Sequence, residues 1–259
     1  MIFPPRIDVL GIRIDPLTFD EAVELVLKWM SEEDCPGRYI VTPNVNHIVL
    51  HRKNELFRDA YAKASLVLAD GRYVIFLSKL LGQRLPEAIS GSDLVPALFE
   101  GVKRGKRITV FFLGALDGVA ELAAAKVTKR WPAIKIAGTY SPPFGFENSD
   151  VETMRIRSIV NEATPDLLVV GVSPPKQEIW LAQNIEYLNI KVGICAGATI
   201  DFLAGAVRRA PYWMQRAGLE WVFRVLMEPR RLVPRYTNDG IVVSKLLISE
   251  FCSRRRNQS

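Results

Sequence analysis

The chain has 259 residues, which is enough for one large domain or for a domain with an appendage. Its content of 49% hydrophobic and 24% charged residues excludes a mostly disordered or low-complexity chain. The net charge of +6 is concentrated in residues 207–259, where ten arginines and one lysine stand against four acidic residues, so the rest of the chain is nearly neutral. Such a basic segment predicts an anionic partner: nucleic acid, phosphates or an anionic membrane surface.

The sequence also bears on membrane insertion and on disulfides. No uncharged apolar run approaches the ~20 residues that a bilayer-spanning helix needs. The first ten residues do not have the pattern of a secretory signal. Because Cys35, Cys195 and Cys252 have no paired spacing, we expect reduced thiols in a cytosolic protein.

Taken in chain order, six short runs rich in β-branched residues predict buried strands, with amphipathic stretches between them. The runs are Tyr39–Val41, Ser65–Leu68, Ile108–Leu113, Ile134–Ala137, Leu167–Val170 and Val192–Cys195. The clearest helix follows Thr18, which can form a capping box with Glu21, and further helices are expected over residues 44–64 and 116–131. This alternation predicts an α/β, Rossmann-like fold with a mainly parallel sheet, helices on both faces and ligands at the carboxyl ends of the strands.

The pattern changes near Gly205, so we expect an α/β core over residues 1–206 and a helical, basic appendage over residues 207–259. An aromatic and basic helical stretch is expected over about 212–227, and prolines punctuate the chain after it. A last apolar stretch, Ile241–Ile248, precedes a run of three arginines.

Several common chemical motifs are absent. The sequence has no glycine-rich dinucleotide loop, no P-loop, no GxSxG elbow and no Asp-x-Asp pair to hold a metal on a sugar nucleotide. The two histidines, His47 and His51, would share one helix face with Glu55, as metal ligands could. We favour an ordinary polar helix face, because a metal site needs ligands that converge from elsewhere. No metal and no cofactor are therefore expected.

Polar segments follow four of the predicted strands. Thr42 and Asn44 come first, and either residue could cap a helix or line a ligand site. Asp70 and Gly71 form an Asp-Gly pair, which is common turn chemistry but is also where a general base would lie.

The other two segments lie further along the chain. In Gly171–Glu178, the N-terminus of a helix together with Lys176 would suit the binding of a diphosphate. The alternative is a helix that begins at a proline for structural reasons alone, with a lysine exposed to solvent. In Gly197–Gly205, small residues let the backbone approach a ligand or let a helix pack tightly.

Together and in this order, these segments resemble the WecG/TagA/CpsF family of bacterial glycosyltransferases over nearly the whole chain. The motifs that carry the resemblance are Thr42-Pro43-Asn44 with His47, Ala69-Asp70-Gly71, Gly91-Ser92-Asp93-Leu94, Pro175-Lys176-Gln177-Glu178, Asp201-Phe202-Leu203-Ala204-Gly205, Arg209-Ala210-Pro211, and the stretch from Gly218-Leu219-Glu220-Trp221 to Glu228-Pro229-Arg230-Arg231.

The resemblance implies an inverting transferase that moves a sugar from UDP to an undecaprenyl-diphosphate-linked sugar, with N-acetylmannosamine as the first candidate. It implies that Asp70 is the base, that Thr42, Asn44 and Gln177 line the pocket, and that the appendage completes the site and helps membrane docking. One position departs from the family pattern. Ala88 stands where the family commonly has arginine, and Arg72, next to Gly71, is the candidate substitute.

The chemistry of an inverting displacement agrees with this implication. It needs a base for the acceptor hydroxyl and stabilisation of the departing diphosphate, which without a metal falls to cations and helix N-termini. The predicted catalytic residue is Asp70. The predicted substrate-binding residues are Thr42, Asn44, Gly71, Arg72, Lys176, Gln177, Gly197, Asp201, Arg209, Arg230 and Arg231. Each lysine and arginine in this set could instead be an ordinary surface charge that is exposed to solvent.

The expected partners are a UDP-sugar, a polyprenyl-diphosphate-linked sugar acceptor and an anionic membrane surface. We expect a cytoplasmic protein, peripheral on the inner face of the cell membrane, and a homo-oligomer stays open. Two other function classes compete: a nucleic-acid-binding protein that uses the basic tail, and a non-catalytic protein that binds a UDP-sugar. Catalysis is favoured because no nucleic-acid module is readable in the core and because binding alone requires no carboxylate at Asp70.

Overall fold

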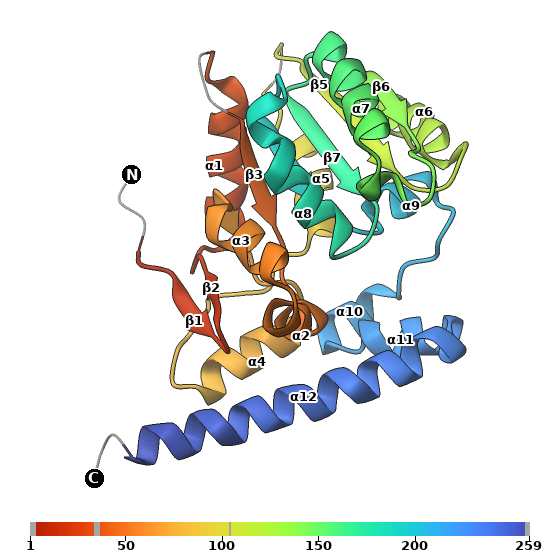
Figure 1. The fold of residues 1–259 in the computed structure, drawn as a ribbon. Helices are drawn as coiled ribbons and strands as arrows, with labels where there is room; N and C mark the ends of the chain where they lie inside the picture. Colours follow the sequence, from red (N-terminus) through yellow and green to blue (C-terminus); the bar gives the residue numbers. More distant parts are fainter. Residues whose placement is uncertain (1–3, 34–36, 104, 257–259) are drawn as a thin grey trace.

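A computed structural model describes residues 4–33, 37–103 and 105–256, so Cys35 lies outside the described residues (Figure 1). Its centre is a six-stranded sheet in the order β4-β3-β8-β7-β5-β6, in which all pairings are parallel. The strands are β3 (Arg38–Val41), β4 (Leu66–Val67), β5 (Ile108–Gly114), β6 (Ile134–Tyr140), β7 (Leu167–Gly171) and β8 (Val192–Cys195). All six lie where the β-branched runs predict them, so the predicted α/β fold is confirmed.

Helices cover both faces of the sheet. One face packs against α1 (Phe19–Ser31), α5 (Gly91–Glu100), α6 (Val119–Arg130) and α9 (Thr199–Ala204). The other packs against α3 (Glu55–Lys63), α7 (Asp150–Ala163) and α8 (Lys176–Asn184), with 3-10 turns at Phe146–Asn148 and Ile185–Tyr187. Successive residues of β7 alternate between the two clusters, Leu167 in one and Leu168 in the other. Because both sides are covered, the inner strands β7 and β8 are buried apolar runs.

Side-chain caps set two of the helix boundaries. Thr18 and Glu21 form the predicted capping box at the start of α1. The single helix expected over 44–64 is instead two, α2 (Val45–Lys53) and α3. The break lies at Asn54, which has extended backbone and whose side chain accepts a 3.1 Å hydrogen bond from the N–H of Phe57.

Two further elements differ from the expectation. A short antiparallel hairpin, β1 (Ile7–Val9) and β2 (Ile12–Ile14), precedes α1, and three-residue strands are too short for a periodic pattern to reveal. The stretch over 212–227 is two helices, α10 (Tyr212–Ala217) and α11 (Glu220–Met227). They are separated at Gly218, whose φ of 75° favours glycine.

The appendage ends in one long helix that lies along the base of the molecule, beneath α2 and α4 (Arg72–Leu80) (Figure 1). This helix, α12, spans Pro229–Arg256 and contains Pro234 without ending there. It buries Val243 and Asp239. The Asp239 carboxylate accepts hydrogen bonds of 3.2 and 3.3 Å from the Asn46 amide of α2. Within the described residues, no helix combines the length and the apolarity that crossing a bilayer requires.

Candidate functional site

The polar segments that follow β3, β4, β7 and β8 meet at one edge of the sheet, because parallel strands end together. The N–H of Asp70 donates to the carbonyl of Pro43 over 2.8 Å. The hydroxyl of Thr42 donates to the carbonyl of Cys195 over 3.4 Å. The structure therefore brings together segments that the sequence places more than a hundred residues apart.

Asp70 lies between β4 and α4, beside Gly71, whose φ of 89° favours glycine. Burial raises the pKa of Asp70 to about 7, and the carboxylate of Glu220 adds to this increase. Arg224 and a hydrogen bond with the Asn44 side chain act in the opposite direction. Asp70 is still partly exposed, so its carboxylate can accept a proton from a bound molecule near neutral pH.

Asn44 fulfils both of the roles that its position suggests. Its Oδ1 accepts a 3.1 Å hydrogen bond from the N–H of Asn46 and so caps α2. The same side chain hydrogen-bonds to Asp70, and because a carboxylate accepts, the amide of Asn44 donates. The helix cap thus fixes the orientation of the group that contacts the candidate base.

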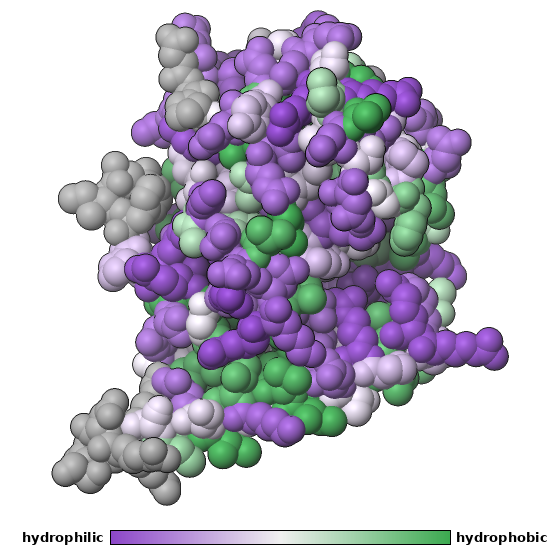
Figure 2. Space-filling view, viewed as in Figure 1, coloured by the Kyte–Doolittle hydropathy of each residue, from purple (hydrophilic) through white to green (hydrophobic). Residues whose placement is uncertain are grey.

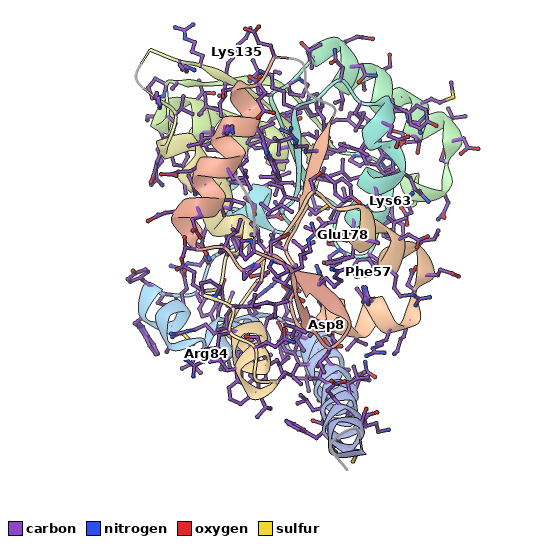
Figure 3. All side chains as sticks on the ribbon, turned by 90° about the vertical axis from the view of Figure 1, so that its left-hand side faces the viewer. Asp8, Phe57, Lys63, Arg84, Lys135 and Glu178 are labelled. Carbon is purple, nitrogen blue, oxygen red and sulfur yellow. The ribbon has the colours of Figure 1, made fainter. Side chains whose placement is uncertain are left out.

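Gln177 and Glu178 form a buried network under this edge, and Figure 3 shows Glu178 at the centre of the molecule. Nε2 of Gln177 donates to Oε1 of Glu178 over 2.7 Å, and the N–H of Gly197 donates to Oε1 of Gln177 over 3.2 Å. Burial raises the pKa of Glu178 to about 7. Its Oε2 has no hydrogen-bond partner among the described residues. Gln177 therefore anchors the loop before α9, and Glu178 orients Gln177.

Small residues let α5 and α9 begin close together at the same edge. A Cβ at Gly91 would lie 3.0 Å from the Cα of Ala196, and the hydroxyls of Ser92 and Thr199 are 3.1 Å apart. At Gly197, by contrast, the space that a Cβ would occupy is open. Free space above Gly197 is what close approach of a ligand to the backbone requires.

Arg209 ties the appendage to the core. Its guanidinium makes two hydrogen bonds with the carboxylate of Asp93 on α5, of 2.7 and 3.0 Å, and one of 3.3 Å with Glu220 on α11. Asp93 and Glu220 are also the two carboxylates that raise the pKa of Asp70. Arg209 therefore balances negative charge beside the candidate base.

The other predicted cations differ in their contacts. Lys176 forms a 2.5 Å ion pair with Glu147. Arg231 forms a 2.6 Å ion pair with Glu228, and Arg230 is exposed at the start of α12. The ion pairs of Lys176 and Arg231 are compatible with the alternative that these two side chains are ordinary surface charges.

Two arginines that are not among the predicted residues also contribute charge to the site. Arg224 is the cation that lowers the pKa of Asp70. Arg235 is half-buried, and its Nε makes no hydrogen bond within the described residues but lies 3.9 Å from a carboxylate oxygen of Asp239. Burial lowers the pKa of Arg235, and nearby Arg224 and Arg231 contribute to the decrease. Arg231 and Arg235 lie four residues apart on α12 and so share one face of that helix, whereas Arg224 belongs to α11.

The remaining predicted residues lie around this edge. Arg72 begins α4, and its side chain packs against the backbone between α10 and α11, where a Cβ at Gly218 would be 3.1 Å from its Cδ. Ala88, at the position of the family arginine, packs against the core. Asp201 is half-exposed on α9, and burial raises its pKa. Substitution of Arg72 for that arginine stays a prediction.

The histidines do not form the polar helix face that we favour from the sequence. His47 is buried, and its Nδ1 lies 2.7 Å from the hydroxyl of Tyr61. Burial lowers the pKa of His47 to about 3. Glu55 belongs to α3, whereas His47 and His51 belong to α2. In the described part of the chain, no three His, Cys, Asp or Glu side chains converge as metal ligands would.

Comparison with known proteins gives the family. Residues 7–257 match the sequence profile of the glycosyl transferase WecG/TagA/CpsF family. The chain is 28% identical over 227 residues to an N-acetylglucosaminyldiphosphoundecaprenol N-acetyl-beta-D-mannosaminyltransferase of Staphylococcus aureus strain MRSA252, covering 88% of this chain and 87% of that protein. Proteins of the same name from strains MW2 and NCTC 8325 are also 28% identical, over the same shares of both chains. Because the profile spans almost the whole chain, this protein belongs to the WecG/TagA/CpsF family and is a glycosyltransferase.

Proposed function

We propose that this glycosyltransferase moves N-acetylmannosamine from UDP to N-acetylglucosamine on undecaprenyl diphosphate, with inversion at the anomeric carbon. The product would serve cell-surface polysaccharide or teichoic acid synthesis. The name of the Staphylococcus aureus relatives supports the transferred sugar and the acceptor. The observation that carries the proposal is the partly exposed carboxylate of Asp70 at the sheet edge, whose pKa is raised to about 7.

In the proposed reaction, Asp70 takes the proton of the acceptor hydroxyl as that oxygen forms a bond to the anomeric carbon. The bond from this carbon to the UDP oxygen breaks, and UDP leaves with the electron pair. Arg224, Arg231 and Arg235 supply positive charge for the departing diphosphate. Attack and departure on opposite faces of the sugar invert the anomeric carbon.

We also propose a cytoplasmic protein that binds peripherally to the inner face of the cell membrane. The acceptor of the named relatives is attached to undecaprenol, a lipid. The arginines of the appendage would add attraction to anionic headgroups, each contributing about 1 kcal/mol near the surface.

A panel of UDP-sugars tests the proposed function. Each is incubated with the protein and a short-chain, lipid-diphosphate-linked N-acetylglucosamine, and UDP release and product are both measured. We expect the fastest transfer with UDP-N-acetylmannosamine. Binding of a UDP-sugar without any transfer would instead support a non-catalytic binding protein. Salt-sensitive binding of nucleic acid without transfer would support a protein that binds nucleic acid through its basic tail.

Transfer is expected to continue in EDTA. The sequence has no Asp-x-Asp pair, and the described cations of the appendage can take the role of a metal at the diphosphate. The measurement is the initial rate after dialysis against EDTA, compared with samples to which Mg²⁺ or Mn²⁺ is restored. A rate that vanishes on chelation and returns with the metal would contradict the proposed leaving-group chemistry.

Arg209→Gln is expected to move the pH–rate profile to higher pH. Asp93 and Glu220 raise the pKa of Asp70, and Arg209 pairs with both. Without the guanidinium their charge acts on Asp70 more strongly, so the base loses its proton at higher pH. The measurement is kcat/KM against pH, with Arg130→Gln, at an exposed ion pair on α6, as the control. A lower rate with an unmoved profile would show that Arg209 only holds the appendage.

A further inference from the structure

Glu178 is a buried carboxylic acid whose placement costs stability. Charged side chains are mostly exposed in this protein, and hydrophilic side chains cover much of the face in Figure 2. Glu178 is fully buried on α8, and Asp239 is the only other buried aspartate or glutamate in the part of the chain that the structure describes. Asp239 faces Arg235, whose Nε lies 3.9 Å from its carboxylate. Tyr61 and Cys195, whose pKa values Glu178 raises, carry no positive charge.

A buried carboxyl group that lacks a cation, and of which Oε2 has no hydrogen-bond partner among the described residues, destabilises the fold. Glu178 lies directly under the edge of the sheet where the candidate base is found, at the centre of the molecule in Figure 3. Groups that break the ordinary rules of stability at such an edge are typical of functional sites. The contacts of Glu178 indicate which function it serves.

The hydrogen bonds of Glu178 fix the orientation of the Gln177 amide. Nε2 of Gln177 donates to Glu178, so Oε1 of Gln177 is left to accept from the N–H of Gly197. If the amide turned over, Nε2 would face that N–H, and two donors cannot form a hydrogen bond. A carboxyl group can accept a hydrogen bond whether it is ionised or protonated. Glu178 therefore selects the one amide orientation that holds Gly197.

Gly197 is held on two sides and is open on a third. Its N–H is bonded to Gln177, and its carbonyl oxygen would lie 2.8 Å from a Cβ at Gly171, so its peptide packs closely against the end of β7. On the side where Gly197 itself would carry a Cβ, the space is open. β8, which leads into this loop, lies between β3 and β7 in the sheet. The backbone at Gly197 is therefore fixed in place and accessible to a ligand at the middle of the edge.

We propose that Glu178 is a positioning residue for the donor: through Gln177, it holds the backbone of Gly197 in the conformation that receives the UDP part of the sugar nucleotide. Glu178 is buried behind Gln177 and acts only through it. The effect falls on binding of the donor and not on proton transfer to Asp70. The inference rests on the proposed function for the identity of the donor.

Glu178→Met tests this role, because methionine has a similar length but is only a weak acceptor. We expect UDP to bind about three- to tenfold more weakly, the fold-change that corresponds to one ordinary hydrogen bond. KM for the UDP-sugar should rise with little change in kcat. Amide exchange at Gly197, followed by NMR without any ligand, should become faster. Glu178→Gln, whose carbonyl can accept from Gln177, should restore most of these losses.

The matched control is Asn184→Leu, which removes a buried polar side chain from the other end of α8. Asn184 is 2% exposed, and its side chain donates to the carbonyl of Trp180 and accepts from Arg157, each over 2.6 Å. Its loss should lower the Tm without changing UDP affinity. A second test combines Glu178→Met with Gln177→Met. If Glu178 acts through Gln177, the double variant should bind UDP as weakly as Gln177→Met alone.

Circular dichroism and the Tm confirm that the variants fold. Wild-type UDP affinity in Glu178→Met, an equal loss in Asn184→Leu, or additive losses in the double variant would each overturn the proposal. A wild-type protein that binds UDP but transfers no sugar would contradict only the proposed function, because UDP affinity and Gly197 exchange are measured without transfer. A wild-type protein that does not bind UDP would overturn both.

Discussion

Asp70→Asn is expected to lower kcat by ~10²–10⁴-fold while UDP binding and the fold are retained, the usual size of a general-base contribution. The amide cannot accept the acceptor proton, but it has the same shape and can keep a hydrogen bond with Asn44. Because the ionised carboxylate is the active form, the wild-type rate should rise with pH through the Asp70 pKa of about 7. That rise should disappear in the variant.

Asp117→Asn is the matched control for this substitution. Asp117 also precedes a glycine in a turn after a strand, but it is exposed and follows β5. The measurements are single-turnover rates, UDP binding by calorimetry and the Tm for both variants. Near-wild-type turnover of Asp70→Asn would show that Asp70 is not the base. A much lower Tm of this variant would show that the carboxylate is needed to stabilise the fold.

The strands of the sheet could be predicted because burial on both faces requires apolar residues at successive positions. In β7, Leu168 and Val169 face opposite clusters, and both must be apolar. The hairpin β1–β2 and the breaks at Asn54 and Gly218 leave weaker marks. Each of the two breaks depends on one residue that leaves the helical conformation, and the hairpin turn depends on Leu10 and Gly11, which both have positive φ. A periodic pattern averages over such positions.

The candidate site was predictable to the extent that strand ends determine it. Thr42 and Asn44 follow β3 and Asp70 follows β4, and the parallel pairing of these two strands brings the three residues to one edge. The arginines of the appendage depend on long-range packing. Contact between Asp239 and Asn46 fixes how α12 lies on α2, and this position directs Arg235 inward. This long-range contact sets the position of α12, so Arg235 is not among the predicted residues, which include Arg230 and Arg231.

The same packing changes how the tail should be tested. Removing residues 241–259 would delete Val243, which is buried in the core cluster, and would separate α12 from the surface it covers. A deletion would therefore mix a folding defect with a docking defect. Substitutions on exposed positions such as Ile248 separate the two effects, because they leave the buried side of α12 intact.

Glu178→Gln is expected to become more stable relative to the wild type as the pH rises. Burial raises the folded-state pKa of Glu178 from 4.5 to about 7. Between these values the folded protein binds more protons at this site than the unfolded chain does, so the wild-type free energy of unfolding falls with increasing pH. The fall approaches about 1.4 kcal/mol per pH unit and amounts to on the order of 3 kcal/mol by pH 8.

Glutamine at position 178 has no charge to desolvate, and its carbonyl can still accept the hydrogen bond from Gln177. The amide nitrogen of the glutamine would take the place of Oε2, which has no hydrogen-bond partner among the described residues. Because a buried N–H₂ group without an acceptor is costly, the variant should be less stable than the wild type at pH 5. The difference should shrink and then reverse toward pH 8. Urea unfolding at each pH measures it, with exposed Glu162→Gln on α7 as the control. A constant difference from pH 5 to pH 8 would show that Glu178 is ionised throughout and is balanced by a cation or by water.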